Sequence, residues 1–84
     1  MKVYYITFRS VTFAQRGEQI LQKSGIRAVL VRTPKWMESQ GCGYSLRIRT
    51  GDIGPAIAML REKTINFRRV YVQSGEGVLE EMAV

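Results

Sequence analysis

The sequence predicts an α+β fold, in which an antiparallel sheet of four strands carries two helices on one face. Two observations support this class. Four short segments are rich in β-branched and aromatic residues, which favour strands, and two segments have apolar residues at helical spacing. The chain has 84 residues, of which 45% are apolar. This length and composition suffice for one domain with a single small core.

The first strand and the first helix are predicted in residues 2–23. Residues 2–8 contain Val, Tyr, Ile, Thr and Phe, which favour an extended strand. Residues 11–23 place their apolar side chains within one arc of about 120° around a helix, and Ser10 is a suitable N-terminal cap. Gly25 stands where a residue of left-handed conformation is expected to end the helix.

Two more strands follow, with a long loop between them. Residues 27–33 favour a strand, which Pro34 ends. Residues 44–49 alternate apolar and polar side chains, as expected of a strand with one solvated face. In the loop, Trp36 and Met37 either cover the open end of the core or shield a bound group.

A second helix, a fourth strand and a tail complete the prediction. Residues 50–52 offer a turn and a cap, and Pro55 suits the first turn of a helix that ends near Asn66. Residues 67–73 favour the fourth strand. Residues 74–84 are acidic and are predicted to form a tail, which is either disordered or a short helix docked on the sheet.

The predicted order is therefore strand, helix, strand, strand, helix, strand. A sheet covered on one side by both helices buries both apolar stripes. Right-handed crossovers place the first and third strands side by side in the middle of the sheet. This is the ferredoxin-like, or split βαβ, arrangement, and we assign residues 1–73 to a single domain of this type.

Composition excludes several classes of function. The chain has one Cys and no His, which excludes an internal disulfide, a Cys-rich zinc site and histidine-dependent catalysis. No apolar stretch is long enough to span a membrane, and the N-terminal residues do not resemble a signal peptide. A free thiol fits the reducing cytoplasm. We therefore expect a cytoplasmic protein without a membrane segment, a bound metal or a cofactor.

Positive charge is concentrated in the predicted domain. The chain carries a net charge of +6, and residues 1–73 hold all 13 basic residues but only four acids, a net +9. The sheet face away from the helices is expected to carry Arg47, Arg49 and Arg69. Tyr71 and either Tyr4 or Tyr5 are expected on the same face. Such a face suits single-stranded nucleic acid, although residues 44–49 lack the aromatic pattern of the RNA-recognition motif. A solvated face and a homodimer surface are the alternatives.

The single thiol, Cys42, stands between Gly41 and Gly43 in the loop before the third strand. Flanking glycines leave room for another molecule to approach the sulfur and permit turns that direct N–H groups at an anion. Three basic residues are near in the sequence: Lys35, Arg47 and Arg49. Positive neighbours favour the thiolate, the nucleophilic form. The alternative is that Cys42 is a small buried residue that fills a gap.

Two stretches of the chain resemble the family of selenium/sulfur carrier-like proteins, small bacterial proteins with a Cys-Gly motif. They are Tyr4-Tyr5-Ile6-Thr7-Phe8 and Gly41-Cys42-Gly43-Tyr44-Ser45-Leu46-Arg47. The resemblance covers about residues 3–73. It implies that Cys42 holds sulfur or selenium and that Gly43 is its partner in the motif. The Cys-Pro-x-Pro helix start of better-known sulfur carriers is absent from this chain.

These observations support two hypotheses of different classes. In the first, Cys42 carries a persulfide or selenopersulfide between donor and acceptor proteins, so the protein is a carrier rather than a self-sufficient enzyme. Lys35, Arg47 and Arg49 would then stabilise the anionic persulfide and steer an acidic partner. In the second, the protein is a basic binding module whose open sheet face takes RNA, a partner protein or a second copy of the chain.

Overall fold

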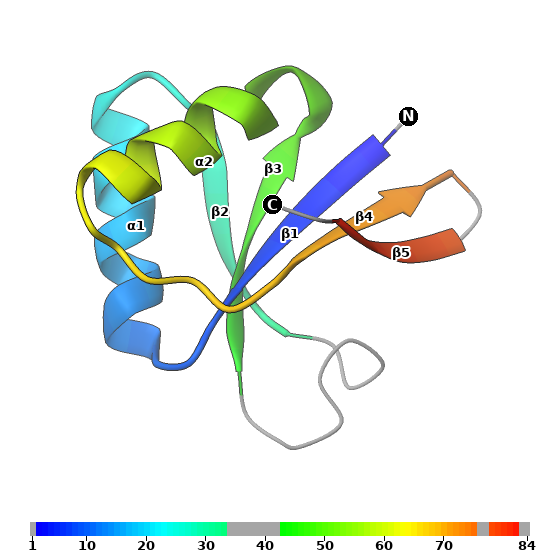
Figure 1. Cartoon of the computed structure of the whole chain (residues 1–84), viewed down its shortest axis with the longest axis horizontal. Coiled ribbons are helices and arrows are strands. Elements are labelled where there is room, and N and C mark those ends of the chain that lie inside the picture. Colours follow the sequence, from blue (N-terminus) through cyan, green and yellow to red (C-terminus); the bar gives the residue numbers. More distant parts are fainter. Residues whose placement is uncertain (1, 34–42, 76–77, 83–84) are drawn as a thin grey trace.

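Figure 1 shows the helices α1 and α2 packed against a twisted antiparallel sheet. The computed structural model describes residues 2–33, 43–75 and 78–82. The predicted α+β class is confirmed, but within these described residues the sheet has five strands rather than four. In chain order the elements are β1 (Lys2–Phe8), α1 (Val11–Lys23), β2 (Ala28–Arg32), β3 (Tyr44–Arg49), the 3₁₀ turn η1 (Thr50–Asp52), α2 (Ile53–Glu62), β4 (Val70–Ser74) and β5 (Val78–Met82).

The strands lie in the order β2-β3-β1-β4-β5, and every neighbouring pair is antiparallel. The expected pairing of the first and third strands is confirmed, because β1 lies at the centre of the sheet between β3 and β4. The register aligns Tyr5 of β1 with Arg47 of β3 and with Tyr71 of β4. These three residues therefore share one row and one face of the sheet.

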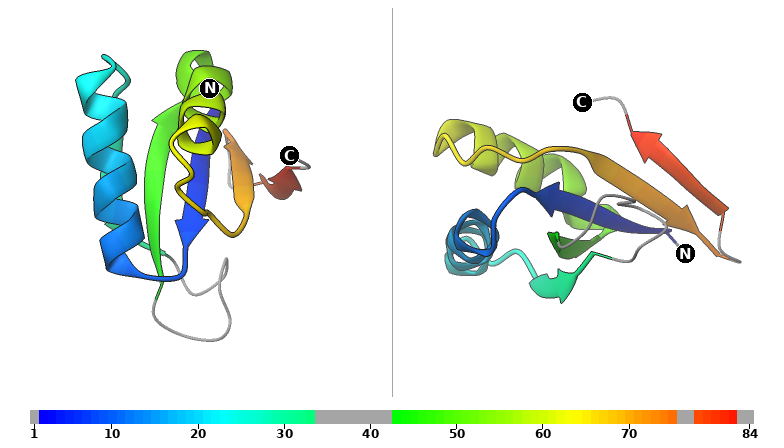
Figure 2. Two further views of the ribbon diagram at one scale, coloured as in Figure 1. Left: turned by 60° about the vertical axis from the view of Figure 1, so that its left-hand side comes forward. Right: turned by 90° about the horizontal axis from the view of Figure 1, so that it is seen from below.

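The core lies between the helices and one face of the sheet. Alternate residues of β1 point into it, as the period of two requires: Tyr4, Ile6 and Phe8. The helices α1 and α2 lie side by side over this face (Figure 2) and bury their apolar stripes against it. The buried helix residues are Ala14, Gly17, Leu21, Ile53, Ala56, Ile57 and Leu60. We call the opposite face of the sheet the open face.

Helix α1 approaches both α2 and β3 closely at Gly17. A Cβ atom at this position would lie 3.2 Å from Leu60 Cδ2 and 3.3 Å from Leu46 Cδ1. Both distances are shorter than ordinary van der Waals contacts between carbon atoms. The absence of a side chain at Gly17 therefore allows the three elements to pack together.

The predicted signals at the ends of α1 are confirmed. Ser10 Oγ accepts a hydrogen bond from the Phe13 amide at 3.3 Å, as an N-terminal cap does. Gly25 takes a left-handed φ of +81° after the last turn. The chain leaves α1 at the place where the sequence predicted its end.

Helix α2 is shorter than predicted, and so is the strand that follows it. The helix ends at Glu62 rather than near Asn66, because Thr64 takes a left-handed φ of +59° that interrupts helical geometry. Asp52 precedes the helix, but its side chain makes no capping hydrogen bond. Strand β4 begins at Val70 and not at residue 67.

The prediction that the acidic residues 74–84 form a disordered tail or a short helix was wrong, since Val78–Met82 form the strand β5. This strand pairs antiparallel with β4, with Tyr71 opposite Glu81 and Val70 opposite Met82. Two adjacent glutamates, which disfavour strands, and the lack of alternation concealed it in the sequence. The signal that could have revealed it is the Ser-Gly-Glu-Gly stretch at residues 74–77, which separates two apolar segments as in a hairpin.

Candidate functional site

The predicted thiol site is only partly within the described residues. Cys42, Gly41 and Lys35 lie outside them, as do Trp36 and Met37. Their expected roles remain predictions. Gly43 is described and buried, and the residues on both sides of the segment 34–42 define the structural frame of the site.

Three interactions join the two ends of this segment. The Thr33 amide donates to the Gly43 carbonyl at 2.9 Å. The hydroxyl groups Thr33 Oγ1 and Ser45 Oγ are hydrogen-bonded at 2.5 Å, and both residues are buried. The Arg32 guanidinium lies over the Tyr44 ring, 6.0 Å from its centroid. We call these five residues the loop base, which holds both chain ends in a fixed geometry beside the Cys-Gly motif.

Buried hydroxyl groups extend the loop base across the open face. Ser45 of β3 stands opposite Thr7 of β1, and these two residues are 0% and 1% exposed. Thr7 Oγ1 accepts from the Arg69 amide at 3.0 Å and lies 3.2 Å from the Arg69 carbonyl, to which it donates. No pattern in the sequence indicated that these residues meet. Alternation in residues 44–49 placed Ser45 on the open face, but its partners come from other strands.

Removing one hydroxyl of the loop base is expected to destabilise the protein. In Thr33→Val, Ser45 Oγ loses its partner while it remains buried, so the free energy of unfolding should fall by about 1 to 3 kcal/mol. The double variant Thr33→Val/Ser45→Ala removes both groups and should cost less than the sum of the single variants. Urea denaturation of the three variants measures this coupling. Strictly additive costs would contradict it.

The predicted binding residues Arg47 and Arg49 lie on the open face and are exposed, as alternation indicated. They follow Gly43 by four and six positions along the chain. At about 3.3 Å per residue, they are about 13 and 20 Å along β3 from Gly43. The described guanidinium at the loop base is instead that of Arg32. The structure thus places Arg32 at the loop base and Arg47 and Arg49 farther along β3.

Tyrosine and arginine meet on the open face, as expected. Tyr5 is the β1 tyrosine on this face, because Tyr4 lies in the core. Arg69 Nη1 donates to Tyr71 Oη at 3.4 Å. The same nitrogen is 4.0 Å from Glu81 Oε1 of β5, and both side chains are about half exposed. The strand missed in the sequence therefore places an acid on a face that was expected to be basic.

Among residues 2–33, 43–75 and 78–82, no group of three or more Cys, His, Asp or Glu side chains is arranged to hold a metal ion. No helix in the same ranges is long and apolar enough to cross a membrane.

Comparison with known proteins gives one family. A family model with the description "Putative Se/S carrier protein-like" matches residues 3–72. The match extends from β1 into β4 and includes the Gly-Cys-Gly motif, whereas β5 lies beyond it. A search of curated proteins finds no match. Because the family model covers most of the chain, the protein belongs to the Se/S carrier protein-like family.

Proposed function

We propose that this protein carries sulfur or selenium on Cys42, as a persulfide or a selenopersulfide, and passes it between partner proteins. One observation carries the proposal: the only thiol in the sequence falls within the segment that the carrier family matches. A carrier that holds these elements as a persulfide or selenopersulfide needs a cysteine thiolate. No other side chain in this sequence provides one.

The transfer is an exchange reaction without net oxidation. Cys42 loses its proton to solvent, and the thiolate attacks the terminal sulfur of a donor persulfide. A new S–S bond forms at Cys42 while the S–S bond of the donor breaks, and the donor leaves as a thiolate that takes up a proton. A donor selenopersulfide delivers selenium in the same way. The acceptor thiolate then repeats the exchange on the loaded carrier.

The described residues next to Cys42 in the sequence support this role. Gly43, the next residue, accepts a hydrogen bond from the Thr33 amide, so the last residue of the motif is held beside the start of β3. Arg32 contributes positive charge at the loop base, where the segment that contains Cys42 begins, and positive charge near a thiol favours its anionic form. We assign Lys35, Arg47 and Arg49 to the steering of acidic partners, whose association should slow as the salt concentration rises. Free thiols persist in the cytoplasm, where we expect the protein to act.

Loading with sulfur tests the proposal directly. The full chain is incubated with a cysteine desulfurase and cysteine, and its intact mass is measured before and after treatment with a reductant. We expect a gain of one sulfur atom that the reductant removes. Peptide mapping should place this sulfur on Cys42. A folded protein that gains no sulfur under conditions that load a known carrier would overturn the proposal.

A further inference from the structure

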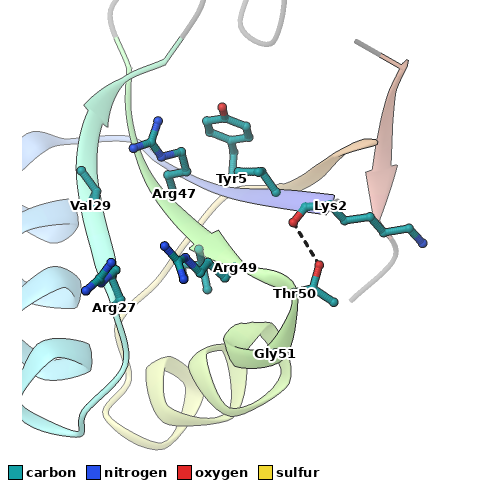
Figure 3. A pocket seen from close by; sticks show the side chains of 10 residues that line it. Lys2, Tyr5, Arg27, Val29, Arg47, Arg49, Thr50 and Gly51 are labelled. Carbon is teal, nitrogen blue, oxygen red and sulfur yellow. Dashed lines mark hydrogen bonds between the residues drawn. The ribbon is translucent and has the colours of Figure 1, made fainter. Parts of the chain in front are cut away.

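A cavity opens on the open face at the end of β3 away from the loop base (Figure 3). Its volume is about 550 Å³. Cavities of 300 to about 1,000 Å³ are typical of small-molecule sites. Val3 and Val29 contribute apolar surface, Tyr5 contributes an aromatic ring, and the turn at Thr50 and Gly51 borders one end. None of these residues belongs to the loop base.

Three arginines line this cavity. They come from different positions in the chain: Arg27 precedes β2, and Arg47 and Arg49 lie on β3. Ala28 pairs with Ile48, so the register places Arg27 across from Arg49, while Val29 stands opposite Arg47. Figure 3 shows the side chains of Arg27 and Arg49 next to one another. We call this site the arginine cavity.

The three guanidinium groups are available to bind an anion. All three side chains are exposed, and among the described residues none of them makes an ion pair or a hydrogen bond. Among the residues that the structure describes, no acidic side chain lines the cavity. Like charges opposite one another in a sheet are destabilising, so an anion bound between them relieves repulsion as well as forming bonds.

The chemistry of the lining indicates the class of ligand. Guanidinium groups bind phosphate oxygens through paired N–H donors, and three of them suit more than one phosphate group. The apolar surface of Val29, which is 38% exposed, and the ring of Tyr5 suit a flat apolar group beside the phosphates. Single-stranded nucleic acid would need a basic groove along the strand with several stacking aromatics. Here the charge is gathered in one cavity with one tyrosine.

We propose that the arginine cavity binds a free nucleoside diphosphate or a similar small aromatic phosphate. Arg27, Arg47 and Arg49 hold the phosphates, and Val29 and Tyr5 contact the base. The described lining residues do not belong to the loop base, and the proposal does not depend on the carrier function. The nucleotide concentration would then determine whether Arg47 and Arg49 are bound to phosphate or are available to an acidic partner protein.

Calorimetric titration of the full chain with ADP, without divalent metal, tests this proposal. We expect saturable binding of ADP, no binding of adenosine and weaker binding of pyrophosphate. The variant Arg47→Gln/Arg49→Gln should lose roughly 100-fold in affinity, about tenfold for each charged hydrogen-bonding group. Cys42→Ser should bind ADP as the wild type does, so this result and the loading result are independent.

The matched control is Arg61→Gln/Lys63→Gln, which removes the same charge from exposed residues outside the cavity. It should bind ADP within about twofold of the wild type, since distant exposed charges are largely screened. Equal losses in the two double variants would show a general charge effect and overturn the site. Absence of ADP binding would overturn it as well, and so would binding of a single-stranded oligonucleotide in its place.

Discussion

Replacing Cys42 with serine is expected to abolish sulfur loading completely and to leave the free energy of unfolding within about 0.5 kcal/mol of the wild type. Serine is nearly the same size, but its hydroxyl does not attack a persulfide at neutral pH. Intact mass spectrometry after desulfurase treatment gives the loading, and urea denaturation gives the stability. The two readouts together distinguish a carrier thiol from a packing residue.

The two interpretations of Cys42 differ in their expected results. If Cys42 fills a gap in the interior, serine places a hydroxyl in an apolar site and costs about 1 to 3 kcal/mol. Alkylation of the native wild-type protein would then be slow, whereas a carrier thiol reacts fast because it is accessible and partly ionised. A destabilised Cys42→Ser protein together with slow alkylation would contradict the carrier proposal. Residual loading in Cys42→Ser would also contradict it.

Ending the chain after Gly77 is expected to lower the free energy of unfolding by about 2 kcal/mol or more. The truncation removes β5 and with it the side chain of Met82, which packs against the core. It also leaves β4 as an unpaired edge, which promotes association between chains. Urea denaturation measures the first effect, and amide hydrogen exchange in Val70–Ser74 measures the loss of pairing.

A full-length variant tests the contribution of the acidic side chains of β5 apart from that of the strand itself. In Glu80→Gln/Glu81→Gln, β5 stays but its acids are neutralised. The Arg69–Glu81 pair is about half exposed, and such pairs contribute little, so stability should change by less than about 1 kcal/mol. If the truncated chain kept both the wild-type denaturation midpoint and the exchange protection of β4, then β5 would not be part of the stable sheet.

Elements in which apolar residues recur at one uninterrupted spacing were predicted well. The predicted bounds of β1, α1 and β3 agree with the structure, because apolar residues recur in each at one regular spacing and caps or glycines mark the ends. β5 has no such period. Its pairing depends on the edge that β4 offers, and local residue preferences do not reveal an edge.

The chemistry of the candidate site remains a prediction, and the structure groups the described residues differently from the sequence. The sequence placed Arg47 and Arg49 near Cys42 because few residues separate them. An extended strand, however, carries Arg49 about 20 Å away from Gly43 in six residues. Thr33 and Ser45, which are twelve positions apart, meet through a buried hydrogen bond. Distance along the chain was therefore a poor guide to distance in space.

By itself the sequence determined which chemical groups are available: one thiol, no imidazole, and an excess of basic residues on strands that alternate between core and open face. Only the tertiary structure decided which of these groups meet. The register of β2 against β3 places Arg27 across from Arg49, and the addition of β5 brings Glu81 to Arg69. Register follows from the packing of core residues that are far apart in the sequence, because a shift by one residue would turn the buried side chains to the open face.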